Sequence, residues 1–583
     1  MTAAFTPPLA ELEQRFRQAT TRAFGPGHEQ VDPLVRRSDR ADFQANLAMS
    51  LGKLLKRPPR DVAQALVGAL ESDDICEKLE IAGPGFINIT LKNEYLDRLL
   101  TAMAADTRLG VAPTAAPETV IVDYGGPNVA KEMHVGHLRP CTIGDCLVRV
   151  LEFAGHRVVR QNHIGDWGTQ FGMLIEHLLD LGGAEKAAEL SVGELDAFYK
   201  AARKKFDGDA AFADRARLRV VALQGGDALT LQLWRVLVDA SAHYFEKVFE
   251  RLHVTMTPAD TRGESFYNPE LPKIAADLEQ RGVAAIEDGA LCVFPEGFKN
   301  REGAPLPVIV RKSDGGFGYA ATDLAALRFR ANELHGQRIL YVVGSPQAQH
   351  FAMVFAVARM AGYVKDDVRT EHVGFGSILG TDRKMLKSRS GETRRLIEVL
   401  DEGQQRALAQ LEERGVDLPD EAKRTLAESL SLAAIKYADL SNDRIKDYIF
   451  DWERMLAAEG NTGPYLQYAQ ARRRSLLRKL EPGEQVDASA VQIQHDRERA
   501  LALSLVGFGE AVRAVESSLE PHKLCSFLYD VASGFSAFWV ECPVLKAETP
   551  APVRASRIAL SDLTGRVLVQ GMSLLGIEAP ERM

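Results

Sequence analysis

The sequence predicts a multidomain α/β protein whose central part is a doubly wound parallel sheet. From residue 119 to about residue 400, short apolar strand segments alternate with helical patterns, which is typical of such a sheet. An N-terminal α+β unit precedes this region. A helical region follows it, indicated by apolar residues that recur at helical spacing: Leu426, Leu430, Ala433, Tyr437 and Leu440.

Four regions follow one another along the chain. Residues 1–115 are expected to form the α+β unit, with an alternating strand at 86–89, and the Pro-containing stretch 112–117 is a linker that few contacts should cross. Residues 116–400 hold the Rossmann-like sheet domain, interrupted at about 176–300 by an insertion of long charged helices. Residues 401–460 form a helical connection, and residues 461–583 form an all-α helical-bundle domain.

Composition excludes several classes of protein. Apolar residues make up 46% of the 583-residue chain and charged residues 26%, as in an ordinary globular protein. No apolar run is as long as a membrane span and no signal pattern opens the chain, so we expect a cytoplasmic protein without a membrane partner. The net charge of −9 argues against binding polyanions over the whole surface, although a local basic face remains compatible with it.

Cysteine usage indicates neither a zinc site nor a disulfide framework. The six cysteines are scattered and contain no CxxC pair. Cys141 and Cys146 are expected to be buried packing residues. We therefore expect no resident metal.

The first candidate functional segment is His134-Val135-Gly136-His137. It lies between the apolar segment 120–122 and a helical run from 142 to 151, and phosphates bind where a strand leads through a loop into a helix. Gly136 lets a nucleotide approach the backbone, and both histidines can donate hydrogen bonds to phosphate oxygens. The four letters alone are also compatible with a chance string at a helix start.

A second segment, residues 380–391, is polar, bounded by glycines, and contains Lys384 and Lys387. Such a loop can place ammonium groups against a triphosphate, although an isolated loop of this kind is more often a solvated turn. Its position downstream of the histidine motif in one α/β domain makes the combination informative.

With both motifs in place, the chain resembles the class I aminoacyl-tRNA synthetases, and in particular the arginyl-tRNA synthetases. The resemblance extends over essentially the whole chain and rests on six further segments: 123–139, 162–172, 311–316, 319–323, 461–469 and 575–583. The sequence departs from the family pattern at Gly125-Gly126, at Pro140 and at Leu386. None of these changes removes a charged group.

The resemblance implies a reaction and the residues that perform it. Arginine and ATP form arginyl-adenylate, and the arginyl group then passes to the 3′ end of tRNA(Arg), with Mg²⁺ on the ATP phosphates. The catalytic residues implied are His134, His137, Lys384 and Lys387, and the ATP site adds Gly136, His350 and Ser388.

The chemistry of arginine independently favours certain residues. A planar cation with five donors calls for a carboxylate and a flat aromatic partner, and Tyr319 and Asp323 share a face if their segment is helical. The resemblance implies that both contact the guanidinium and that Asp123 is a further acidic partner. Asn128 and Gln347 hold the amino and carboxylate groups. His163 lines the pocket floor or is structural, and Asp323 could alternatively be a helix N-cap.

Contacts with tRNA are expected at both ends of the chain. The arginine-rich stretch 468–479 predicts a phosphate-binding helix face, with a solvated face as the alternative. The resemblance implies that the last domain binds the anticodon and the first unit the tRNA elbow, where helix packing is the alternative role for the residues named. The tRNA-contacting candidates are Phe43, Gln44, Asn46, Tyr465, Tyr468, Arg472, Arg473 and Arg554.

Three other functions remain open. A class I synthetase for another amino acid, such as cysteine, would need cysteine and histidine zinc spacing that this sequence lacks. A non-catalytic RNA-binding paralogue would not need intact histidines and lysines. A small-molecule nucleotidyltransferase would not need the two flanking domains. The partners expected are tRNA(Arg), L-arginine and ATP, and the chain is expected to be a monomer.

Overall fold

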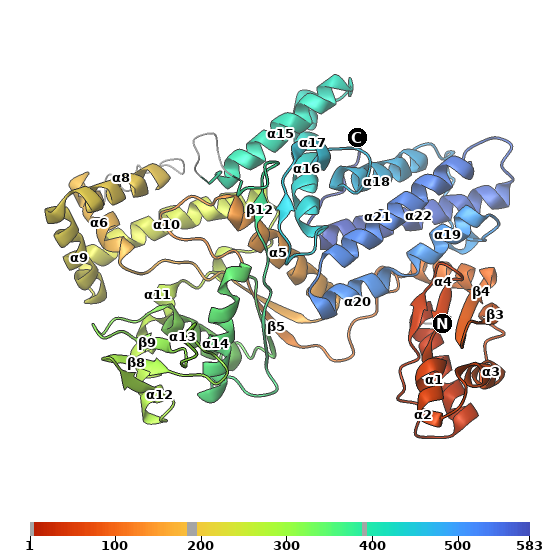
Figure 1. The fold of residues 1–583 in the computed structure, drawn as a ribbon. Coiled ribbons are helices and arrows are strands. Elements are labelled where there is room, and N and C mark those ends of the chain that lie inside the picture. The colour runs from red at the N-terminus through yellow and green to blue at the C-terminus, as the bar shows by residue number, and fades with distance from the viewer. Residues whose placement is uncertain (1–4, 184–194, 387–392) are drawn as a thin grey trace.

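The computed structural model describes residues 5–183, 195–386 and 393–583. The N-terminal unit is an antiparallel sheet of order β1-β2-β4-β3 covered by helices (Figure 1). Its elements are α1 (Pro8–Phe24), β1 (Val35–Arg37), β2 (Phe43–Ala45), α2 (Leu47–Leu55), α3 (Pro59–Ala69), β3 (Cys76–Ala82), β4 (Phe86–Leu91) and α4 (Asn93–Ala105).

The central sheet has order β11-β10-β5-β6, and each neighbouring pair is parallel. Side chains of β5 alternate between two cores: Val120 and Val122 pack with α5, whereas Ile121 packs with α13 and α14. Helices therefore cover both faces, and the predicted doubly wound parallel sheet is confirmed. The elements are β5 (Thr119–Asp123), η1 (Val135–His137), α5 (Leu138–Phe153), β6 (Arg157–Gln161), α13 (Tyr319–Asn332), β10 (Arg338–Tyr341), η4 (Ser345–Gln347), α14 (Ala348–Met360), β11 (Arg369–His372) and β12 (Ile378–Leu379).

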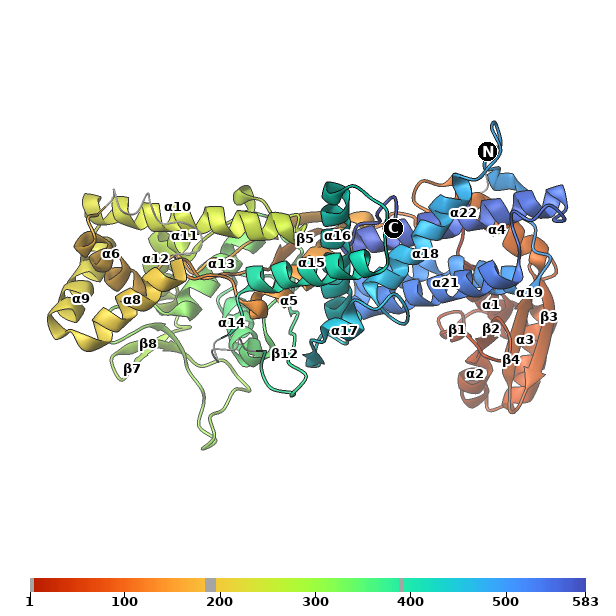
Figure 2. The ribbon, with the colours of Figure 1, turned by 90° about the horizontal axis from the view of Figure 1, so that it is seen from above.

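Long helices project from the sheet between β6 and α13, as the charged helical pattern predicted (Figure 2). The region also contains an antiparallel sheet, β7-β8-β9, that the sequence did not indicate, because strands of three or four residues carry too little alternation to register. The elements are α6 (Gln170–Asp180), α8 (Leu195–Gly208), α9 (Ala210–Gln224), α10 (Ala228–Arg251), η2 (Pro258–Asp260), α11 (Glu264–Tyr267), η3 (Asn268–Glu270), α12 (Leu271–Gln280), β7 (Ala285–Glu287), β8 (Ala290–Val293) and β9 (Val308–Arg311).

The C-terminal third of the chain, from α15 onward, is mostly helical, and α16 connects its parts. Lys436 on α16 is buried and donates from Nζ to the carbonyl of Gly576, 2.8 Å away, which fixes the end of α22 to the connecting helix. The elements are α15 (Leu396–Glu413), α16 (Asp420–Leu440), β13 (Tyr448–Ile449), α17 (Trp452–Met455), α18 (Gly463–Leu477), η5 (Ala488–Ala490), α19 (Asp496–Leu505), α20 (Phe508–Ser518), α21 (His522–Glu541) and α22 (Ala551–Leu574).

The N-terminal unit docks firmly on the C-terminal bundle (Figures 1 and 2). Arg499 of α19 donates to both carboxylate oxygens of Asp42 at 2.8 Å and to the carbonyl of Leu91 at 2.8 Å. Arg566 of α22 donates to the carbonyls of Ala104 and Asp106. The expectation that few contacts would hold this unit in place is therefore wrong. The linker composition describes the local chain and carries no information about a docking surface far along the sequence.

Candidate active site

A cavity of about 610 Å³ opens at the carboxyl ends of β5 and β10, the edge at which parallel α/β sheets bind ligands. It brings together residues that the sequence predicted from segments far apart in the chain: Asp123, Asn128, Gly136, His137, His163, Tyr319, Asp323, Gln347 and His350. The same cavity is lined by Glu264, which no sequence pattern indicated.

The histidine motif forms a tight turn that leads into α5. The backbone N–H of Gly136 donates to Nδ1 of His134 at 3.0 Å, and the N–H of His134 donates to Nδ1 of His137 at 3.1 Å. Nδ1 of His134 thus acts as an acceptor, which leaves its Nε2 to carry the proton. Nδ1 of His137 also lies 3.3 Å from the carbonyl of His134. A side chain at Gly136 would meet the ring of His134 at 2.7 Å, so the ring would have to leave its position.

Both imidazoles of the motif are held in the neutral form. The rings lie 4.1 Å apart between centroids. Burial, followed by the neighbouring His134, lowers the pKa of His137 to about 3. Burial, followed by Lys131, also lowers the pKa of His134. At neutral pH the pair therefore offers ring N–H donors without a competing positive charge.

The departures from the family pattern agree with the local backbone. Gly125 and Gly126 have φ values of +88° and +55°, a region that glycine adopts without strain. Pro140 lies in the first turn of α5, where the N–H that proline lacks has no intrahelical partner.

The predicted guanidinium partners lie on α13. Tyr319 is its first residue and Asp323 lies one turn further on, so both share a face, and Asp323 is not the N-cap. Tyr319 is 76% exposed, which leaves its ring free to cover a ligand. Oδ2 of Asp323 lies 2.6 Å from Nε2 of His350, the predicted ATP residue in the first turn of α14.

Asp123 is engaged below the cavity by a residue of the chain itself. Its Oδ2 lies 2.8 Å from a guanidinium nitrogen of Arg330, which is fully buried and stacks 4.9 Å from the ring centre of Tyr341. Arg330 is seven residues after Asp323 on α13, which places both on one helix face. The role of this arginine has no signal in the sequence, because composition gives no reason to expect a guanidinium in the core.

Glu264 supplies a third carboxylate to the cavity, in addition to Asp123 and Asp323. Burial, followed by the neighbouring Asp166 and Asp323, raises its pKa to about 8. It is the first residue of α11. Its backbone N–H donates to the carbonyl of Ile164 at 3.1 Å, and this bond holds α11 next to the segment that follows β6. The sequence could not single out this glutamate, because it lies in the insertion at about 176–300, where charged residues are common. His163 stacks on Tyr267 nearby, with ring centres 5.7 Å apart.

The lysine-containing loop is described only in part. Lys384 is exposed in a turn after β12, where its N–H donates to Asp382 at 3.0 Å, and it does not line the cavity. Lys387 and Ser388 lie outside the described residues. His134 also does not line the cavity itself, although its ring contacts His137.

The residues predicted to bind tRNA in the C-terminal domain are mostly on α18. The hydroxyl of Tyr465 and the guanidinium of Arg472 both bond Oγ of Ser536, at 3.2 and 2.9 Å. Arg473 pairs with Asp562, and Arg414 donates to the hydroxyl of Tyr468. Arg472 is the exposed cation among the candidates on this helix.

Two predicted contacts are already occupied or covered in the structure. Arg554 forms a two-pronged contact with Glu484, at 3.0 and 2.8 Å. Phe43 is fully buried in β2, so its ring packs in the core and cannot reach RNA; the prediction for this residue is corrected. Gln44 is half-buried and donates to Asn88 across the strand pair at 2.7 Å, and Asn46 precedes α2.

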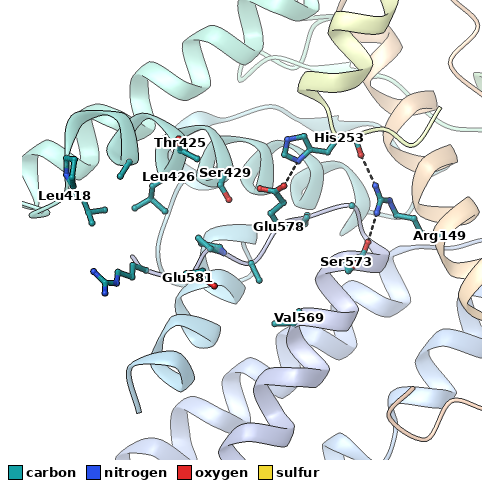
Figure 3. Close-up of a pocket in the computed structure, with 17 residues that line it drawn as sticks. Arg149, His253, Leu418, Thr425, Leu426, Ser429, Val569, Ser573, Glu578 and Glu581 are labelled. Carbon is teal, nitrogen blue, oxygen red and sulfur yellow. Dashed lines mark hydrogen bonds and ion pairs between the residues drawn. The ribbon is translucent and has the colours of Figure 1, made fainter. Parts of the chain in front are cut away.

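A larger cavity of about 920 Å³ lies elsewhere, between α16, the end of α22 and the chain's last residues (Figure 3). At its edge Arg149 donates to the carbonyls of His253 and Ser573, and Nδ1 of His253 is 3.4 Å from Glu578 (Figure 3). Of the described residues predicted to bind ATP or arginine, none lines it. The smaller cavity therefore remains the candidate active site.

Comparison with known proteins identifies the family. Residues 99–452 match the family described as tRNA synthetases class I (R), catalytic domain. Residues 10–91 match the arginyl tRNA synthetase N terminal domain, and residues 466–583 match the DALR anticodon binding domain. The chain belongs to the arginyl-tRNA synthetase family.

Relatives and solved structures agree over the full length. The arginine–tRNA ligase of Thermobifida fusca is 50% identical and aligns over 99% of this chain and all of the relative. The arginine–tRNA ligase of Synechococcus sp. is 47% identical with the same coverage. The structures of arginyl-tRNA synthetase from Plasmodium falciparum and Thermus thermophilus superpose with TM-scores of 0.84 and 0.81 at 28% and 27% identity. These cover 100% and 99% of this chain and all of each structure.

Among the described residues no helix is long and apolar enough to cross a membrane. Within the same residues no group of three or more histidine, cysteine, aspartate or glutamate side chains is arranged to hold a metal ion. The six cysteines are all buried and unpaired, which confirms the packing role expected for Cys141 and Cys146.

Proposed function

We propose that the chain activates L-arginine with ATP, forming arginyl-adenylate and pyrophosphate, and transfers the arginyl group to the 3′ adenosine of tRNA(Arg). One observation carries this proposal: the cavity at the carboxyl edge of the sheet joins the turn at His137 to the two carboxylates of Asp323 and Glu264. One end suits phosphates and the other suits a guanidinium. Membership of the arginyl-tRNA synthetase family supports tRNA as the acceptor.

Activation needs no nucleophile from the protein. The arginine carboxylate attacks the α-phosphorus of ATP, and pyrophosphate leaves on the opposite side. The Nε2–H groups of His134 and His137 donate to the phosphate oxygens as charge develops. The N-terminus of α5 adds its positive dipole end at the same place. Lys384, Lys387 and Ser388 supply further charge and donors, and Mg²⁺ arrives with ATP as part of the substrate.

The guanidinium is proposed to bind between Asp323 and Glu264, with the ring of Tyr319 over its plane. Asn128 and Gln347 face the amino and carboxylate groups, and His350 lies towards the ATP. His163 completes the floor. Asp123 contributes negative charge from below, balanced by Arg330.

For tRNA, we propose that the N-terminal unit contacts the elbow through Gln44 and Asn46. Tyr465, Tyr468, Arg472, Arg473 and Arg554 then contribute to the anticodon face. The protein is proposed to act as a monomer in the cytoplasm, and its mass in solution under dilute conditions tests the first of these statements.

The test is pyrophosphate exchange over a panel of amino acids, with and without tRNA. The decisive comparison is arginine against citrulline, which has nearly the same shape but no charge. The carboxylates in the pocket predict exchange with arginine and none with citrulline or lysine. A His137→Ala variant should lose exchange while its KM for arginine stays near that of the parent. Exchange with cysteine, or with no amino acid at all, would reject the proposal.

A further inference from the structure

The segment that follows the lysine loop is bonded directly to the histidine turn. The N–H of Val135 donates to the carbonyl of Arg394 at 2.9 Å, and the N–H of Leu396 donates to the carbonyl of Met133 at 2.8 Å. These two bonds form an antiparallel bridge between His134 and Arg395. The backbone of His134 is therefore positioned by residues more than 250 positions further along the chain.

The opposite side of the same turn is fixed by the long helix α10. The N–H of Ala130 donates to Oγ of Ser241 at 2.9 Å, and the N–H of Met133 donates to the hydroxyl of Tyr244 at 3.1 Å. Ser241 and Tyr244 are both buried. Both backbone groups of Met133 are thus bonded, so the turn has little freedom on that side.

A side-chain ion pair closes this arrangement. A guanidinium nitrogen of Arg395 lies 3.2 Å from Oε2 of Glu132, two residues before His134, and the Glu132 side chain is only 3% exposed. The same guanidinium donates to Glu398 in the first turn of α15, at 2.8 Å. An ion pair with a carboxylate this deeply buried is less screened by water than one at the surface. Removing the Arg395 guanidinium therefore weakens the contact that joins residues 394–396 to the segment that carries His134.

We propose that Arg395 is a positioning residue for the histidine turn, and that its ion pair with Glu132 holds His134 and His137 in register with the ATP phosphates. Arg395 touches neither substrate. It acts through Glu132 and the bridge to His134, so its contribution is expressed when the two imidazoles meet the developing charge. A displacement of about 1 Å at such a site can lower the rate by roughly 100-fold. This inference rests on the proposed function, because it assigns the phosphate contacts to the same histidines.

The test is pyrophosphate exchange by the full chain with saturating tRNA, using Arg395→Ala, Arg395→Lys and Glu132→Gln. We expect kcat to fall by roughly 10–100-fold in Arg395→Ala, with the KM for arginine changed less than about twofold, since Asp323 and Glu264 are untouched. Arg395→Lys should recover part of the rate. The double variant Glu132→Gln/Arg395→Ala should be no slower than the worse single variant, because both changes remove one interaction.

Arg217→Ala is the control, because Arg217 forms a comparable ion pair with Asp214, 2.6 Å away within the exposed face of α9. Its kcat should equal that of the parent. Parental kcat in Arg395→Ala, a parallel rise in the KM for arginine, or additive losses in the double variant would overturn the inference. If the parent protein does not exchange pyrophosphate with arginine, the proposed function is wrong. If the parent is active and Arg395→Ala is equally active, only the positioning role of Arg395 is wrong.

Discussion

Oδ2 of Asp323 lies 2.6 Å from Nε2 of His350, so the carboxylate proposed to bind the guanidinium is held by an imidazole in the structure. The hydrogen bond with Asp323 raises the pKa of His350. A protonated His350 and the substrate guanidinium are then two cations that require the same carboxylate. Arginine bound at Asp323 would therefore compete with the imidazole for this carboxylate.

The first prediction concerns pH. The KM for arginine should fall as the pH rises from about 6 to about 9, measured by exchange at saturating ATP. On the acidic side, protonated His350 competes for Asp323, and this competition is lost above its pKa. On the basic side, Glu264, whose pKa is raised to about 8, becomes ionised and attracts the guanidinium more strongly.

Two variants separate these causes. His350→Asn should flatten the acidic limb, and Glu264→Gln should flatten the basic limb. A KM that is independent of pH in the parent would contradict both assignments. If the acidic part of the pH dependence persists in His350→Asn, only the role of His350 is contradicted. If the basic part persists in Glu264→Gln, only the role of Glu264 is contradicted.

The second prediction concerns the selectivity of the pocket. Asp323→Asn should raise the KM for arginine while the KM for ATP changes little, because the amide keeps the shape and removes the charge. Removing one partner from a buried, hydrogen-bonded charge pair costs about 2–5 kcal/mol. Equal losses for both substrates would instead indicate that Asp323 supports α13, and Tyr319→Phe, which keeps the ring, serves as the mild control.

The third prediction concerns the lysines. Lys384→Ala and Lys387→Ala should each slow adenylate formation far more than they weaken arginine binding, since the ammonium groups are proposed to act on the departing phosphates. Loss of one such contact costs about 3–4 kcal/mol, or roughly 100–1,000-fold in rate. Arg383→Ala, which removes a neighbouring exposed cation, should leave the rate near that of the parent. Parental turnover in both lysine variants would remove them from the mechanism.

The parts of the site that the sequence could predict are those with a local signal. The turn from His134 to His137 follows a strand and opens a helix, and Tyr319 and Asp323 are one helical turn apart, so spacing alone places them. Glu264 and Arg395 have no such signal. Glu264 reaches the site through its backbone bond to Ile164, and Arg395 through the bonds that its neighbours Arg394 and Leu396 form with Val135 and Met133. These contacts exist only after the chain has folded.

The same distinction explains the corrections elsewhere. Phe43 is flanked by polar residues and could be assigned to RNA, but the strand register of β2 turns its ring into the core. Arg330 shares a helix face with Asp323, yet its burial depends on Asp123 and Tyr341, which belong to two other strands. Periodicity gives the face of a helix, and only packing gives what lies against that face.

The fourth prediction concerns the dependence of activation on tRNA. Arg414 follows the last residue of α15 and donates to the hydroxyl of Tyr468 on α18, whereas the other end of α15 begins at the bridge to His134. One helix thus contacts both the anticodon domain and the histidine turn. Tyr468→Phe, which removes only the hydroxyl, should reduce the stimulation of exchange by tRNA by about fivefold or more, with a smaller change in the KM for tRNA.

Tyr363→Phe is the matched control, because the hydroxyl of Tyr363 donates to Asp277, 2.8 Å away, in a bond that involves neither α15 nor the C-terminal domain. It should retain full stimulation. Unchanged stimulation in Tyr468→Phe would mean that α15 does not transmit the state of the anticodon domain. Full exchange by the parent without any RNA would show that activation and tRNA binding are uncoupled.

The fifth prediction concerns the docking of the N-terminal unit. Arg499 is 20% exposed and Asp42 only 8%, so breaking their two-pronged contact leaves a largely buried carboxylate unpaired. Arg499→Ala should therefore loosen the unit, which increases proteolysis near residues 112–117 and raises the KM for tRNA. Exchange at saturating tRNA should change less, since the cavity lies in another domain.

Arg497→Ala provides the comparison that makes this result interpretable. Arg497 lies on α19 as Arg499 does, but it pairs with Glu541 inside the bundle at 2.8 Å. Removing it changes the charge of the same helix by the same amount without touching the N-terminal unit, so its KM for tRNA should match that of the parent. One outcome would show that the N-terminal unit does not bind RNA: Arg499→Ala becomes sensitive to protease, yet its KM for tRNA stays unchanged. A binding surface that is no longer held in a fixed orientation should bind more weakly, because the cost of ordering it is then added to binding.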